Sequence, residues 1–348
     1  VMLSSATIVD GIFLGNYVGA QALASVNLIL PATSLLFAVT LMISVGGSVM
    51  CGKYVGEGRR RAADAIFTKT LLSVIGFGLL FALLSIVFLD EVIALLGVNE
   101  ELAGPAGRYF LIFCQFQTFF MGAICLSFFL RLDGRPVFVS TVIIANACLN
   151  IALDYLFIVE WELGVEGAAY ATAISHASNV LLFASHLVTG EGRLRLTRAM
   201  GSIKELVRAA YNGVSECTNE MSVGLLTLLF NWVMITRLGV DGVAAFSIVN
   251  YMLFIGLMVS YGIADSLQPL VSTNFGARRP DRIASFVLVA ALSAAGLGLV
   301  LAALVLLAPE MMVQLFLKDG DERAFSIALQ FSSLFWPAFL FSGVNIVI

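Results

Sequence analysis

The sequence predicts an all-α polytopic membrane protein, and its composition, its apolar runs and its charge pattern support that prediction. Hydrophobic residues make up 60% of the chain and charged residues only 12%, about half the charge of an average soluble domain. Several uninterrupted apolar runs exceed the roughly 18 residues that mark a membrane-spanning helix. Barrel strands would instead alternate apolar and polar residues over about ten positions, so the spans are expected to be helices.

Ten spans are expected in chain order. They cover residues 1–16, 27–51, 66–89, 105–130, 136–159, 166–189, 206–236, 245–272, 283–307 and 324–347. Loops on one side are basic, as in residues 53–61 and 190–208, and loops on the other side are acidic, as in residues 90–101 and 160–166. About fifteen Lys and Arg residues fall on one side and about four on the other, and the positive-inside rule assigns the basic side to the cytoplasm. The sequence therefore predicts a multi-pass protein of the cell inner (plasma) membrane with the linker 190–208 in the cytoplasm.

The chain also contains an internal repeat with an offset of 220 residues. In this register Gly56 falls on Gly276 and Gly78 on Gly298. Each copy would hold six helices, an even number, so the copies are expected to form two six-helix bundles related by an axis along the membrane normal.

The repeat predicts the domain organisation. We expect an N-terminal bundle over 1–190, a cytoplasmic linker over 191–205 and a C-terminal bundle over 206–348. The second copy has no counterpart of the helices in 136–189, so we expect a parent protein of about twelve helices. The present chain would then hold about ten, without the start of the first helix and without the last two.

Residues 136–160 predict a membrane helix with one polar face. Asn146, Asn150 and Asp154 recur every four residues, so they share that face. A carboxylate at membrane depth costs at least a few kcal/mol and usually faces protein or water. Two interpretations remain open: a hydrogen-bonded polar seam between helices, and a cation site.

Asp10 is a second acid inside a predicted span of the first half, and the helix 166–189 places Thr172, His176 and Asn179 on one face. Carboxylate, amide and hydroxyl oxygens are ligands that hard cations prefer. These residues could bind either a proton or Na⁺, and the sequence leaves both open. His176 could equally be a hydrogen-bonded structural residue.

The second half carries a different set of acids, namely Glu216, Glu220 and Asp265. Acids inside a cavity with aromatic or Met walls would attract amphipathic cations, so these three are candidates for substrate binding. A pair of glutamates at a helix end can also be a solvated face.

Motifs of enzymes are absent from the sequence. It contains no H-E-x-x-H, G-x-S-x-G, Walker or dinucleotide-binding pattern. We therefore expect no enzymatic activity and no cofactor, and transport would have to be driven by an ion gradient or a partner subunit.

Several stretches resemble the multidrug and toxic compound extrusion (MATE) family of transporters, especially its MepA-like branch. They are VDGIFLGNYVGAQALASVNLILP, GKYVGEGRRRAAD, FFLRLDGRPVF, LNIALDY with GVEGAAYATAIS, and GVAAFSIVNYMLF with QPLVSTNFGA. The resemblance implies two six-helix bundles facing a central cleft and a site for H⁺ or Na⁺ formed by Asp10, Asn150, Asp154 and Thr172. An acid that some relatives carry on the tenth helix is missing here, since residues 324–347 contain no carboxylate.

The predicted function is a cation-coupled antiporter that exports cationic amphipathic drugs or toxic organic compounds by alternating access. Its expected partners are small organic cations, H⁺ or Na⁺ and the lipid bilayer, with no nucleic acid, and a monomer is expected. One alternative is a flippase for lipid-linked precursors or metabolites on the same scaffold. The alternative from another class is a non-transporting membrane receptor or assembly protein in which the acids are structural.

Overall fold

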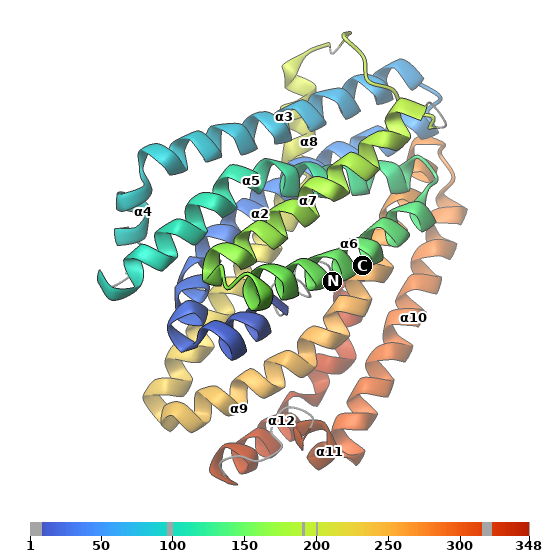
Figure 1. Cartoon of the computed structure of the whole chain (residues 1–348). Coiled ribbons are helices and arrows are strands. Elements are labelled where there is room, and N and C mark those ends of the chain that lie inside the picture. Colours follow the sequence, from blue (N-terminus) through green and yellow to red (C-terminus); the bar gives the residue numbers. More distant parts are fainter. Residues whose placement is uncertain (1–8, 96–99, 190–191, 200, 315–321, 348) are drawn as a thin grey trace. The chain divides into compact units, whose positions relative to one another are not determined.

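The computed structural model of the chain (Figure 1) describes residues 9–95, 100–189, 192–199, 201–314 and 322–347. Within these residues the regular elements are all helices, and seven stretches are long and apolar enough to cross a membrane. The predicted all-α polytopic class is therefore confirmed. The chain divides into two compact units, Met2–Met221 and Ser222–Ile348.

The first unit ends shortly after the start of the longest helix. Its elements are η1 (Leu14–Val18), α2 (Ala20–Gly56), α3 (Arg60–Val87), α4 (Leu89–Leu95), α5 (Glu100–Leu132), α6 (Pro136–Asp154), η2 (Tyr155–Glu160), α7 (Gly164–Thr189) and α8 (Ile203–Asn212), where η marks a π-helix. The second unit holds most of α9 (Val214–Gly276), together with α10 (Pro280–Leu307), α11 (Pro309–Gln314) and α12 (Glu322–Val347).

Seven membrane-capable stretches are fewer than the ten expected spans. The expected span 1–16 begins outside the described residues. The span 206–236 is divided between α8 and α9, and the span 245–272 lies entirely in α9. Because α9 has 63 residues, it would be about 95 Å long if straight, about three times the hydrocarbon thickness. The polar face of α7 lowers its mean hydropathy, so this helix is not among the seven.

Local sequence explains where several helices begin. Pro136 and Pro280 lie in the first turns of α6 and α10, where the N–H that proline lacks has no partner within the helix. Ser202 caps α8, since its hydroxyl accepts a hydrogen bond from the Lys204 backbone N–H at 3.2 Å.

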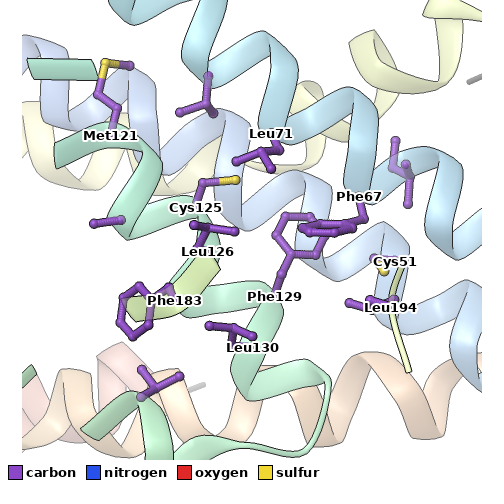
Figure 2. Close-up of a cluster of buried hydrophobic side chains, with 14 of the residues drawn as sticks. Cys51, Phe67, Leu71, Met121, Cys125, Leu126, Phe129, Leu130, Phe183 and Leu194 are labelled. Atoms are coloured by element: carbon purple, nitrogen blue, oxygen red, sulfur yellow. The ribbon is translucent and has the colours of Figure 1, made fainter. Parts of the chain in front are cut away.

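The core of the first unit is a cluster of buried apolar side chains from α2, α3, α5, α6 and α7 (Figure 2). The rings of Phe67 and Phe129 lie 4.8 Å apart at their centroids, with Cys125 and Leu126 buried beside them. Lipid tails are as apolar as these side chains, so close packing rather than escape from water holds such helices together. The result is a rigid bundle that fixes the polar faces of α6 and α7.

The helix boundaries follow the predicted repeat. α2 ends at Gly56 and α9 ends at Gly276, which are 220 residues apart. The same offset of 220 separates the starts of α3 and α10, their ends, and the starts of α4 and α11. Both copies therefore share these helix boundaries in the register that the sequence predicts, although α9 is continuous where the first copy is divided into η1 and α2.

The loops that precede α3 and α10 also share one backbone conformation. Gly58 and Arg278 both have left-handed backbones, with φ of 74° and 53°. In each loop the next N–H donates to the carbonyl five residues earlier, at 2.9 Å for Arg59 and 3.0 Å for Arg279. This is the Schellman arrangement that ends many helices, and glycine suits it better than arginine.

Gly78 and Gly298, which are equivalent in the repeat, sit where two helices approach closely. A Cβ on Gly78 of α3 would lie 2.8 Å from Thr118 Oγ1 of α5, and a Cβ on Gly298 of α10 would lie 2.8 Å from the Leu340 carbonyl oxygen of α12. We expect Gly78→Ala and Gly298→Ala each to lower the free energy of unfolding by about 1–3 kcal/mol, because the helices must separate. Thermal unfolding in detergent measures this.

Gly76 and Gly296 give matched controls on the same two helices, because a Cβ there would meet no atom within 4 Å. Alanine at these positions should leave stability unchanged or raise it by up to about 1 kcal/mol, since alanine favours helix. Equal losses at the control and test positions would contradict the close-packing explanation.

Residues 193 and 194 of the linker are held on the first unit by one buried acid. The Asp133 side chain, only 1% exposed, lies in the loop between α5 and α6. Its Oδ1 accepts the backbone N–H groups of Arg193 at 2.7 Å and Leu194 at 3.1 Å, and its Oδ2 lies 3.4 Å from His186 Nε2. We call these four residues the linker clasp.

The linker continues along α3, where two more side chains hold its backbone. Asp64 accepts the Arg195 N–H at 2.9 Å, and Thr68 accepts the Thr197 N–H at 3.0 Å. The linker is therefore fixed to the first unit by hydrogen bonds to its main chain.

After the linker, α8 packs directly on α2. A Cβ on Gly46 would collide with the Ala209 carbonyl, and a Cβ on Gly213 would collide with the Met42 carbonyl. Only glycine allows backbones to approach this closely. The first compact unit consequently extends to Met221, whereas the C-terminal bundle was expected from residue 206; the domain boundaries stay predictions.

An ion pair joins α8 to α3. Lys69, whose side chain is 5% exposed, donates to Glu205 Oε2 at 2.6 Å and to the Ser202 carbonyl at 3.0 Å. The hydrogen bond from Lys69 holds the pKa of the Glu205 carboxyl below its usual range. A depressed carboxyl pKa contributes stability that is complete above the unfolded-state pKa and is lost as pH falls through the folded-state pKa.

We therefore expect Glu205→Gln to lower the unfolding temperature at neutral pH, because it leaves Lys69 without its counter-charge. The difference between wild type and variant should shrink as pH falls below about 4, where wild-type Glu205 also becomes neutral. Thermal unfolding at several pH values checks this, and a difference that is constant with pH would contradict it.

Candidate functional site

A buried carboxyl pair lies in the first unit between the N-terminal helical turn, α6 and α7. Asp10 is 3% exposed and Asp154 is fully buried. Thr172 of α7 donates from its hydroxyl to Asp10 Oδ2 at 2.8 Å. The side chains of Asp154 and Asn150 are the next neighbours of the Asp10 carboxyl, and Asn150 is 2% exposed. The structure thus brings together four residues that the sequence singled out: Asp10, Asn150, Asp154 and Thr172.

Most polar atoms of this group have no hydrogen-bond partner among the described residues. The unpaired atoms are Asp10 Oδ1, both carboxyl oxygens of Asp154 and Asn150 Nδ2. Two unit charges 4 Å apart repel by about 4 kcal/mol at an effective dielectric constant of 20. A proton shared by the two carboxyls, or a small cation between them, would remove this repulsion and pair the free oxygens. The donor set therefore fits H⁺ or a hard monovalent cation.

Two π-helical segments adjoin the carboxyl pair. The turn that carries Asp10 leads directly into η1, and Asp154 is the last residue of α6 before η2. Single π-turns are rare and occur often at functional sites. The sequence does not predict these segments, because an apolar run has the same pattern in an α-helix and in a π-helix.

Tyr109 of α5 also lies near this site and is not among the residues that the sequence predicts for it. It is 7% exposed and lies within electrostatic range of both Asp10 and Asp154. Its hydroxyl is one of several polar groups in the expected span 105–130, together with Gln115, Gln117 and Thr118, and these polar groups are the signal that could have identified it.

The three accessory residues lie on the same two helices. Asn146 on α6 is 8% exposed and Asn179 on α7 is 1% exposed. His176 is half-buried, and its ring packs 4.8 Å from the ring of Phe120. His176 thus lies against an aromatic wall, while the two asparagines are enclosed.

The candidate acids of the second half are not part of this group. Glu216 and Glu220 lie one turn apart at the start of α9, in the first unit, and both are half-buried. Asp265 is half-buried further along α9, in the second unit. Their predicted role in substrate binding stays a prediction.

No cluster of three or more His, Cys, Asp or Glu side chains suited to a metal is found in the described part of the chain. The site is instead a pair of carboxyls with an amide and a hydroxyl. This composition suits an ion that binds and leaves better than a permanently held transition metal.

The fold is that of known membrane transporters. It matches the outward-facing conformation of a multidrug resistance MATE family transporter of the MOP superfamily, with a TM-score of 0.89 and 20% identity over 99% of this chain and 77% of that chain. It also matches a MOP superfamily transporter from Pyrococcus furiosus, described as having a binding pocket of reverse polarity that suggests a different function. That match has a TM-score of 0.85 and 20% identity, over 99% of this chain and 80% of the other.

Sequence comparison gives the family. The MatE family model matches residues 1–156 and 220–348, and the chain belongs to this family. The family consists of transporters, which agrees with the expectation that the chain is not an enzyme.

Curated relatives include two bacterial proteins. The multidrug export protein MepA of Staphylococcus aureus (strain MSSA476) is 23% identical over 269 residues, covering 77% of this chain and 59% of that protein. The probable multidrug resistance protein YoeA of Bacillus subtilis is 25% identical over 359 aligned residues, covering 100% of this chain and 76% of that protein. The chain spans 58–59% of the length of the MepA proteins that it matches.

Proposed function

We propose that the protein is a cation-coupled antiporter that exports amphipathic organic cations by alternating access. Asp10, Asn150, Asp154 and Thr172 bind the coupling ion, which is H⁺ or Na⁺. The observation that carries this proposal is the buried carboxyl pair, in which Asp10 is fixed by the Thr172 hydroxyl and the remaining carboxyl oxygens are unpaired. The names of the MepA and YoeA relatives support a drug as cargo.

In alternating access, the cation and the drug are coupled because each binds one conformation of the protein more tightly than the other. A cation at the carboxyl pair stabilises one conformation and the drug stabilises the other, and each can shift the equilibrium only by its difference in affinity for the two. A charge that enters down a potential of 100 mV releases about 2.3 kcal/mol. Exchanging one entering monovalent cation for one leaving monovalent drug moves no net charge, so voltage-dependent export would require at least two entering cations.

The distribution of buried bases argues against an anionic cargo. Lys69 is the only lysine or arginine that is buried in the described part of the chain, and Glu205 neutralises it. A flippase for anionic headgroups would need basic side chains free to face its substrate. The Pyrococcus furiosus relative, with its reversed pocket polarity, is a reason to test anions in the same assay.

Ethidium efflux from energised cells that express the full-length protein tests the proposal. We expect export that stops when the membrane gradient of the coupling ion is collapsed, by an uncoupler for H⁺ or by removal of external Na⁺. Absence of efflux for several organic cations at verified membrane abundance would overturn the multidrug proposal.

A further inference from the structure

Buried polar side chains extend from the carboxyl pair through the first unit, beginning with Asn150 of the site itself. We call this group the polar seam, and it consists of Gln117, Asn146, Asn150, Ser175 and Asn179. Each of these residues is buried, between 1% and 8% exposed. Each has at least one polar side-chain atom without a hydrogen-bond partner among the described residues.

The packing of α6 against α7 shows which residues of the two helices lie at the same height along the helix axes. The two helices are antiparallel, since the Phe138 ring contacts the His186 ring at one end and a Cβ on Gly167 would contact the Phe157 backbone at the other. A step toward the carboxyl end of α6 therefore matches an equal step toward the amino end of α7.

With this register, the amides and the hydroxyl form a column. Asn146 lies level with Asn179, and Asn150 lies level with Ser175. From Asp154 to Asn146 the column extends eight residues along α6, which is about 12 Å. It leads from the carboxyl pair toward the end of the unit that carries the linker clasp.

α5 adds Gln117 to the same column. The Phe120 ring contacts the His176 ring at 4.8 Å, and α5 and α7 both run toward the linker clasp. Gln117 is three residues before Phe120, so it lies level with residues 173–175 of α7. Both its Nε2 and its Oε1 are unpaired.

The unpaired atoms distinguish this seam from a simple structural contact. A buried polar atom without a partner costs about 1–3 kcal/mol, and in a seam that only joined helices the side chains would bond to one another. Such atoms are usually satisfied by water or ions that bridge several polar groups. Three helices each supply them here, in a line that begins at the carboxyl pair.

An apolar layer separates the seam from the clasp. Val139, Val142 and Phe183 are buried, at 5% exposure or less, and belong to one apolar cluster. They occupy the turns of α6 and α7 between the seam and His186. The seam is therefore continuous with the carboxyl pair but closed at the other end in this conformation.

We propose that the polar seam is a hydrated route through which the Asp10–Asp154 site exchanges its cation with the side of the membrane that carries the linker. Its ligand is a small monovalent cation, either Na⁺ or a proton carried on water. The amide and hydroxyl groups replace part of the hydration shell, and the apolar layer opens and closes the route. The role of this route rests on the proposed function, because it assumes that the carboxyl pair binds the coupling cation. Its test measures access to the route and does not require transport.

Silver ion tests the route, because it is a monovalent cation that reacts with thiols. In a variant whose five native cysteines are replaced, Ser175→Cys exchanges a hydroxyl for a thiol with little change in shape. Ag⁺ is added to inside-out membrane vesicles, and the remaining free thiol is counted with a fluorescent maleimide after denaturation. Asn179→Cys is the second variant, in case the first does not fold.

A protein that retains only Cys125 is the matched control, because Cys125 is fully buried on α5 in the apolar cluster. We expect Ag⁺ to consume the Ser175→Cys and Asn179→Cys thiols at least about tenfold faster than Cys125, since access controls thiol reactivity. Protection by added Na⁺ would identify Na⁺ as the ion, and no protection would identify water that carries a proton.

Equal rates for the seam thiols and Cys125 would overturn the proposal and leave the seam as packed structure. The readout counts thiols without drug and without a gradient. Fast reaction in a protein that exports nothing would therefore support the route and overturn only the proposed export function. A protein that exports drug but whose seam thiols react as slowly as Cys125 would support the proposed export function and overturn the route.

Discussion

Asp154→Asn is expected to abolish cation-coupled export. The substitution keeps the size and most of the polarity of the side chain but removes the group that can take up and release a proton or balance a cation. Even substitutions of residues that merely orient an ion ligand typically cost about 10–100-fold in affinity or activity, so loss of a buried ligand itself should reduce efflux to the level of cells without the protein. Ethidium efflux at matched membrane abundance measures this.

Two further variants make that result specific. Thr172→Val removes the hydroxyl that donates to Asp10 and should weaken coupling without abolishing it. Asp90→Asn makes the same chemical change at an exposed acid of α4 and should leave efflux unchanged. Normal, gradient-dependent efflux by Asp154→Asn would refute the role of the carboxyl pair.

Asp133→Ala is expected to release the linker from the first unit. The buried carboxylate accepts two backbone N–H groups, from Arg193 and Leu194, and its loss leaves both donors unpaired at about 1–3 kcal/mol each. A loss of about 2 kcal/mol would raise the population of the detached linker about 30-fold. Trypsin, which cuts after Arg193 and Arg195, should then cleave detergent-solubilised protein correspondingly faster.

Asp133→Asn is the matched control for the linker clasp. Its amide oxygen can still accept both N–H groups, so cleavage should rise much less than in Asp133→Ala. If trypsin cut both variants and the wild type at the same rate, the hydrogen bonds of the clasp would not be what holds the linker.

Much of the fold and part of the site could be predicted because their signals are local or periodic. The spacing of Asn146, Asn150 and Asp154 by four residues sets one helix face whatever surrounds it. The pairing of Gly78 with Gly298 is a match of sequence to sequence, and the structure shows the same helix contact at both.

What could not be predicted depends on contacts between distant segments. In the sequence Asp133 is an ordinary turn residue, and only the fold shows that it accepts the N–H groups of residues 193 and 194. Likewise, nothing near Lys69 in the sequence indicates Glu205 as its partner. The π-segments beside Asp10 and Asp154 were missed for another reason, since one extra residue per turn leaves no mark on an apolar run. The expected break between the spans 206–236 and 245–272 does not appear, because α9 holds most of the first span and all of the second.

The loops before α3 and α10 show that one backbone conformation can be formed by different residues. At equivalent positions one copy has Gly58 and the other Arg278, yet the backbone is left-handed at both and the hydrogen bonds differ by only 0.1 Å. The two copies therefore differ in this side chain while the chain path between their helices is the same. Main-chain geometry is thus kept here where residue identity is not, which agrees with a solved structure of only 20% identity matching this fold at a TM-score of 0.89.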